Sequence, residues 1–118
     1  MMKWRDTRME EMMDTKKIKS KTEFDTTIQN GVTLVDFNAP WCAPCRSQEP
    51  ILERIADQFD GKAIIAAMNI DNHQDIAMGL GIQSIPTLII FKNNKEIQRF
   101  IGLQPETTLT GALEKLLD

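Results

Sequence analysis

Four apolar runs of strand length stand out along the chain. The first two, residues 32–37 and 63–70, are apolar almost throughout, which is typical of strands covered on both faces. The other two, residues 87–91 and 97–101, flank Lys92-Asn93-Asn94-Lys95, a sequence typical of a hairpin turn. The pattern therefore predicts four strands, the last two of which pair as an antiparallel hairpin.

A spacing near 3.6 between apolar residues predicts helices elsewhere. A short helix is expected after Ser20, which has capping-box spacing to Glu23. Pro50 lies inside a longer helix, expected over residues 42–59, and should bend that helix because proline removes an amide donor. Three helices are expected in the rest of the chain, over residues 42–59, 74–80 and 106–117. Strand–helix–strand units imply parallel pairing, so the whole pattern predicts an α/β fold with a mixed sheet and helices on both faces.

The chain is long enough for one domain and too short for two, at 118 residues. Its first 14 residues hold five of the seven methionines and show no helix-capping signal. Residues 1–16 are therefore expected to form a flexible N-terminal extension, with an amphipathic helix as the alternative. Residues 17–118 are expected to form the domain.

Charge and hydropathy exclude two classes of partner. The net charge is -3 and no block of Lys or Arg occurs, so nucleic acid is not an expected partner. No stretch approaches the roughly 18 apolar residues that a membrane span requires, so no membrane association is expected. Acidic residues follow Lys3 and Arg5, where the apolar part of a secretory signal would lie. A cytoplasmic location is the resulting expectation.

The two cysteines, Cys42 and Cys45, form a single Cys-x-x-Cys unit. They can bridge only to each other or to a partner molecule, and so short a loop restrains the unfolded chain too little for a stabilising role. A zinc site would need four ligands, and the single histidine, His73, lies far along the chain in a polar run typical of an exposed turn. The pair is therefore expected to carry chemistry without a metal.

The position of the pair indicates which cysteine should react first. Cys42 lies between a buried strand and a helix start, where free amides and the helix dipole stabilise a thiolate, the attacking species. Cys45 lies one turn further into the helix and should be more buried. That suits the thiol that resolves a mixed disulfide and releases reduced product. Pro44 stiffens the first turn without loss of an amide donor.

Several motifs resemble those of the thioredoxin family in identity and spacing. They are Val35-Asp36-Phe37, Ala39-Pro40-Trp41-Cys42-Ala43-Pro44-Cys45, Pro50, Asn69-Ile70-Asp71, Ile85-Pro86-Thr87-Leu88 and Gly102. The resemblance covers residues 17–118 and implies the three-layer thioredoxin fold. It also implies reversible dithiol–disulfide exchange, most simply the reduction of protein disulfides.

The resemblance gives Asp36 a role in proton transfer. Asp36 interrupts an apolar strand, where burial of a carboxylate raises its pKa. In the family the matching acid lies beneath the active site and takes the proton from the resolving thiol, which here is Cys45. A solvent-facing position on the strand is the alternative.

Other residues would shape a substrate groove by the same resemblance. Pro86 matches the family's cis proline, which faces the disulfide, and the backbone at Ile85 would pair with an extended substrate strand. The alternative is a trans proline at the start of a strand. Trp41 would cover one side of the disulfide, and Gly102 would let substrate approach, although a turn glycine explains that residue almost as well. Together with Ala43 and Pro44, these residues complete the expected groove.

Three positions depart from the family pattern. Ala43 stands where glycine is common, Asn38 replaces a frequent aromatic residue, and Ala67 stands where many members have a lysine near the buried acid. Loss of that cation removes one influence that favours ionised Asp36. These departures bear on redox potential and partner choice and leave the reaction class unchanged.

The resemblance implies no metal and no bound organic cofactor. Electrons should come from a reductase of the thioredoxin reductase type and pass to disulfide-containing client proteins. Two alternatives remain open from the sequence. One is an oxidase or isomerase with the same fold in an oxidising compartment, and the other is a non-catalytic binding module that uses the groove to hold a partner.

Overall fold

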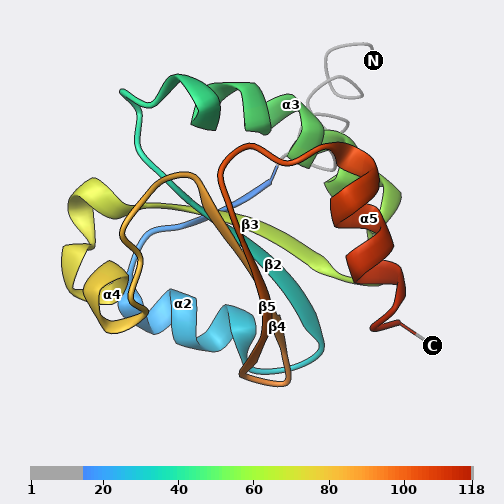
Figure 1. Cartoon of the computed structure of the whole chain (residues 1–118). Helices are drawn as coiled ribbons and strands as arrows, with labels where there is room; N and C mark the ends of the chain where they lie inside the picture. Colours follow the sequence, from blue (N-terminus) through green and yellow to red (C-terminus); the bar gives the residue numbers. More distant parts are fainter. Residues whose placement is uncertain (1–14, 118) are drawn as a thin grey trace, which may run out of the picture.

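A five-stranded mixed sheet runs through the centre of the computed structural model, which describes residues 15–117 (Figure 1). The strands lie in the order β1-β3-β2-β4-β5. β1, β3 and β2 run parallel, whereas β4 is antiparallel to β2 and β5 is antiparallel to β4. This topology confirms the predicted mixed sheet with its late hairpin. The strands are β1 (Lys16–Ile18), β2 (Val32–Asn38), β3 (Ile64–Asn69), β4 (Thr87–Lys92) and β5 (Lys95–Ile101).

Helices cover both faces of the sheet (Figure 1). α2 and α4 pack on one face, and α3 and α5 pack on the other, which gives the predicted three-layer α/β arrangement. No helix within residues 15–117 is long and apolar enough to cross a bilayer. The helices are α2 (Lys21–Ile28), α3 (Ala43–Gln58), α4 (Gln74–Gly79) and α5 (Glu106–Glu114), with a 3-10 helix, η1 (Ile70–Asn72), between β3 and α4.

Successive side chains of β2 point alternately into two separate cores. Val35 and Phe37 pack with Phe24 of α2 in the core on the α2 face. Leu34 packs with Leu52 of α3 in the core on the α3 face. Because side chains alternate along a strand, Asp36 points to the same face as Leu34, toward α3.

The first described element, β1, differs from the sequence expectation, which began with a helix. Lys16 and Lys17 are exposed and only Ile18 is buried, so the strand lacks an apolar run that would predict it. It forms because it pairs in parallel with β3, with Lys17 opposite Ala67. The extension expected over residues 1–16 lies outside the described residues except for its last two.

The start of α2 follows the predicted capping signal with one change. The Ser20 hydroxyl accepts a hydrogen bond from the Glu23 amide at 3.0 Å, as a capping box requires. The Glu23 carboxylate accepts from the Lys19 amide at 2.8 Å, one residue before the amide that a capping box would use. Both side chains thus satisfy amides at the helix start that have no partner within the helix.

Candidate active site

A disulfide joins Cys42 and Cys45 at the start of α3, with the two Cα atoms 5.2 Å apart. Cys42 is the N-cap of the helix, and its sulfur accepts a hydrogen bond from the Cys45 amide at 3.2 Å. Both cysteines are buried. The sequence placed Cys42 at a helix start and paired it with Cys45, and the structure confirms both expectations.

The turn before the helix holds Cys42 in this capping position. β2 ends at Asn38, and the Cys42 amide then donates to the Ala39 carbonyl at 3.3 Å. The Arg46 guanidinium, one turn into α3, donates to the Pro40 carbonyl at 2.9 Å. Free amides and the dipole of α3 therefore point at the Cys42 sulfur, where they favour a thiolate once the disulfide is reduced.

Pro86 lies beside the disulfide, and the Ile85–Pro86 peptide bond is cis. The Cys42 sulfur is 3.9 Å from the Ile85 carbonyl oxygen, although the two residues are 43 positions apart in the chain. The alternative of a trans proline at a strand start is therefore wrong. The structure brings the Pro86 turn and the cysteine turn together at one end of the sheet, where β2 ends and β4 begins.

Gly102 follows β5 and faces the same turn. Its amide donates to the Pro86 carbonyl at 2.8 Å, and its φ of +90° belongs to a region that favours glycine. Apart from Gly102 and its two chain neighbours, no atom of residues 15–117 lies within 4 Å of the position that a Cβ would take there. The backbone conformation alone accounts for glycine at this position, and the space beside it is open.

Trp41 is largely exposed, with 68% of its surface accessible. Its indole N–H donates to the Asp71 carboxylate at 3.0 Å, which ties the ring to the start of η1. Ile101 and Leu103, on either side of Gly102, are also exposed apolar side chains. Asp71 was part of the motif that resembles the family, but sequence reasoning gave it no role.

Asp36 is completely buried and points toward α3. The Asn38 side-chain amide donates to one of its carboxyl oxygens, Oδ2, at 3.3 Å, while the other, Oδ1, has no hydrogen-bond partner within residues 15–117. Burial raises the pKa of Asp36 from its ordinary value of 3.8 to about 7, although the Asn38 hydrogen bond lowers it. The alternative of a solvent-facing position is wrong, and Asp36 can exchange a proton near neutral pH.

Gln48 is a buried polar residue that sequence reasoning missed. Its side-chain oxygen accepts from the Gln104 amide at 2.8 Å, and its side-chain nitrogen donates to the Gln104 carbonyl at 3.0 Å. These two bonds tie α3 to the loop that follows Gly102. Its position three residues after Cys45, on the buried side of α3, was a signal that could have found it.

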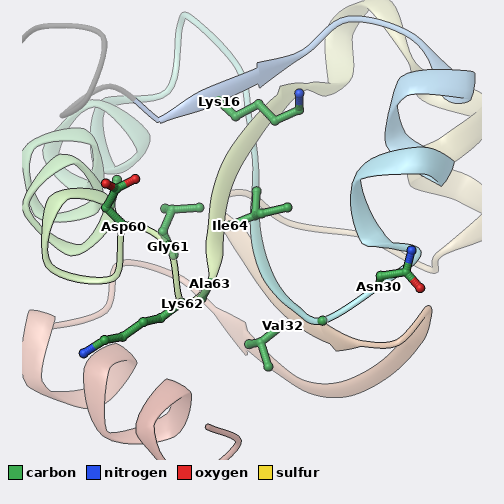
Figure 2. A pocket seen from close by; sticks show the side chains of 11 residues that line it. Lys16, Asn30, Val32, Asp60, Gly61, Lys62, Ala63 and Ile64 are labelled. Atoms are coloured by element: carbon green, nitrogen blue, oxygen red, sulfur yellow. The ribbon is translucent and has the colours of Figure 1, made fainter. Parts of the chain in front are cut away.

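The cavity drawn in Figure 2, of about 580 Å³, lies away from the cysteines. Lys16, Val32 and Ile64 line it, and these residues begin the three parallel strands. The disulfide follows the opposite end of β2. None of the lining residues is a cysteine, so this cavity is not the place of thiol chemistry.

Comparisons with known proteins agree with this geometry. The family model for thioredoxin matches residues 15–115. Thioredoxin from Staphylococcus saprophyticus is 43% identical over 96 residues, which cover 81% of this chain and 92% of the relative. Thioredoxin from Staphylococcus aureus is 40% identical over 95 residues, which cover 80% of this chain and 91% of the relative.

A solved structure shows the same fold. A mutant thioredoxin from Halobacterium salinarum superposes with a TM-score of 0.84 at 32% identity, covering 91% of this chain and 94% of that chain. Family model, relatives and solved structure thus agree with the disulfide geometry at Cys42 and Cys45. The chain therefore belongs to the thioredoxin family and is a thiol–disulfide oxidoreductase.

Proposed function

We propose that this protein reduces disulfides in client proteins, with Cys42 as the nucleophile and Cys45 as the resolving thiol. The observation that carries the proposal is the place of the Cys42 sulfur at the N-cap of α3, where it accepts the Cys45 amide at 3.2 Å. A thiolate at this atom is stabilised by the helix start, and the thiolate is the species that attacks a disulfide.

The reaction proceeds in two exchanges. The Cys42 thiolate attacks one sulfur of the client disulfide, which forms a mixed disulfide and releases the other client sulfur as a thiolate that takes a proton. The Cys45 thiol then loses its proton and attacks Cys42, which forms the Cys42–Cys45 disulfide and releases the second client thiol. The client gains two electrons and two protons, and the protein becomes oxidised.

Asp36 is proposed as the base for the second exchange. It lies on β2, points toward α3, and has one carboxyl oxygen, Oδ1, without a hydrogen-bond partner in the described part of the chain. Because the Asn38 side-chain amide already donates to Oδ2, Oδ1 is the atom that would carry the proton. A pKa of about 7 lets the group accept a proton near neutral pH and give it up again.

The residues around the disulfide are proposed to form a groove for an extended client segment. The backbone at Ile85 would pair with that segment, and Trp41 and Gly102 would flank it, while Ala43, Pro44 and Pro86 would shape its floor. The support is the 3.9 Å approach of the Ile85 carbonyl to Cys42 and the open space beside Gly102. Backbone pairing would give affinity without demanding one client sequence.

Electrons are proposed to come from a reductase of the thioredoxin reductase type. A protein that gives electrons to disulfides must itself be reduced after each cycle, because it ends as the Cys42–Cys45 disulfide. We place this activity in the cytoplasm, because a reducing role requires a compartment that keeps thiols reduced.

Trapping tests the roles of the two cysteines. Cys45→Ser is expected to accumulate a mixed disulfide with a disulfide-containing client such as insulin, because no thiol remains to resolve it. Cys42→Ser is the matched control and should form no such adduct. The adduct is detected by mass spectrometry without reductant. Equal trapping by both variants, or trapping by Cys42→Ser alone, would contradict the assignment.

A redox titration tests the direction of the reaction. Equilibration of the full chain with a glutathione buffer is expected to give a potential near about -270 mV, the poise of a reductant. A potential above about -200 mV would instead indicate an oxidant or isomerase and would also contradict the cytoplasmic location.

A further inference from the structure

One row of residues crosses the sheet on the face that carries Asp36. Lys17 of β1 pairs with Ala67 of β3, and Ala67 pairs with Asp36 of β2. Paired residues on neighbouring strands point to the same face, so all three side chains point to the α3 side. Two steps between strands separate the Lys17 and Asp36 backbones by about 10 Å.

Ala67 lies between these two residues in the row. Its side chain is a single methyl group, whereas the Lys17 side chain is long and exposed. From the sequence alone, the cation near Asp36 was expected to be lost because Ala67 replaces a lysine. The structure instead brings a cation to the same row from the neighbouring strand, β1.

Glu49 approaches the same region from α3. It lies four residues after Cys45, so it is on the same side of the helix. Lys17, Glu49, Asn38 and Ala67 line one cavity of about 560 Å³. Asn38 connects this cavity to the buried carboxyl, because its side-chain amide donates to Asp36 Oδ2.

Lys17 and Glu49 are the two charged side chains in residues 15–117 that act on Asp36. Beyond burial and the Asn38 hydrogen bond, Glu49 raises the pKa of Asp36 and Lys17 lowers it. The remaining neighbours in its row, Ala67 and Leu88, are uncharged. Lys19 and His73 also line this cavity, but neither belongs to the row of paired residues that contains Asp36.

We propose that Lys17 and Glu49 are positioning residues that set the ionisation of Asp36 from β1 and α3, the two elements that bring them to this cavity. Lys17 favours the carboxylate and Glu49 favours the protonated acid. The consequence for catalysis rests on the role proposed for Asp36. Since a base near neutral pH changes its ionised fraction most steeply there, small changes in either neighbour alter the rate at which Cys45 is deprotonated.

The test is a direct titration of Asp36 in the full-length oxidised protein. The ¹³C shift of the Asp36 carboxyl is followed from pH 4 to pH 10. Lys17→Met, which keeps most of the unbranched side chain and removes the charge, should raise the midpoint by about half a unit, and Glu49→Gln should lower it by about as much. The double variant should return close to the parent value. Lys19→Met is the matched control and should leave the midpoint unchanged.

Kinetic measurements distinguish a failure of this inference from a failure of the proposed function. The rate at which the mixed disulfide is resolved is measured against pH by stopped flow in the same variants, and its midpoint should follow the NMR midpoint. Carboxyl midpoints that stay within about 0.1 unit of the parent in both single variants would overturn the inference. Midpoints that move while the rate profile stays fixed would support the inference and contradict the role of Asp36 as the base.

Discussion

Asp36 combines complete burial with a carboxyl group that is only half satisfied by hydrogen bonds. The Asn38 side-chain amide donates to Oδ2 at 3.3 Å, and none of the residues that the structure describes donates to Oδ1. An ionised carboxylate in such a place destabilises the folded state unless charges compensate it. A residue that serves only stability would be apolar here, like its strand neighbours Leu34 and Val35. The proton transfer proposed for Asp36 therefore explains the acid better than a role in stability does.

Asp36→Asn should stabilise the protein in a pH-dependent way. The folded state raises the pKa of Asp36 from 3.8 to about 7, so the native protein binds this proton more tightly than the unfolded chain. The contribution of Asp36 to the free energy of unfolding is then largest below about pH 4, falls between pH 4 and 7, and is constant above. Since asparagine does not ionise, the variant should gain up to about 4 kcal/mol over the parent at pH 8 and little at pH 4.

Urea denaturation of oxidised protein at pH 4, 6 and 8 measures this difference. Asp60→Asn is the control, because Asp60 is an exposed acid just after the end of α3. It should show no such trend. A gain for Asp36→Asn that is equal at all three pH values would show that ionisation of Asp36 does not cause it.

At the scale of elements, the sequence predicted the helices and strands whose burial leaves a local pattern of apolar residues. β2 and β4 are covered on both faces, so their apolar runs are nearly unbroken and their bounds fall within one residue of expectation. The hairpin signal also held, because Asn93 and Asn94 adopt the positive φ values, 51° and 77°, that its tight turn requires. β1 was not predicted, because its sequence begins with two lysines and shows no apolar run. The strand forms through its pairing with β3.

At the active site, too, the sequence predicted what a local pattern contains and missed what depends on contacts between distant residues. Cys42 and Cys45 were found from their spacing and place in the chain, while the cis bond before Pro86 came only from the resemblance. Gln48 was not found, because its partner, Gln104, lies 56 residues away. The row that joins Lys17 to Asp36 also depends on the order of strands, which no local pattern contains.

Gln48→Ala should loosen the contact between α3 and the loop after β5. The change leaves the amide and the carbonyl of Gln104 without their buried partner, which should lower the free energy of unfolding by about 2 kcal/mol. Urea denaturation measures the loss. Amide NMR shifts at Gly102 should change as well, because that loop loses its attachment.

Gln58→Ala is the matched control for this contact. Gln58 lies on the same helix but is exposed, so its removal should change stability by less than about 0.5 kcal/mol. If Gln48→Ala were as mild as this control, the two hydrogen bonds to Gln104 would not hold the loop.

At the scale of the whole molecule, the reactive groups are attached to the two best-buried strands. Cys42 follows the end of β2, and Pro86 precedes the start of β4, its direct neighbour in the sheet. β2 and β4 contain side chains with no accessible surface, including Leu34, Val35 and Ile89. The disulfide and the Pro86 turn are thus attached to the best-buried part of the fold, which favours a preformed shape for the proposed groove.

Amide hydrogen exchange of the oxidised full-length protein should show that the central strands are more stable than the edge of the fold. β2 and β4 have neighbours on both edges and helices on both faces, so their amides should exchange only through global unfolding. β1, a three-residue edge strand, and α4, a six-residue helix, should open locally and exchange at least about 100-fold faster. NMR-detected exchange at constant pH resolves these elements in one experiment. Protection in α4 equal to that in β4 would mean that the fold opens as a single unit. In that case the whole domain, rather than β2 and β4 alone, would determine the shape of the proposed groove.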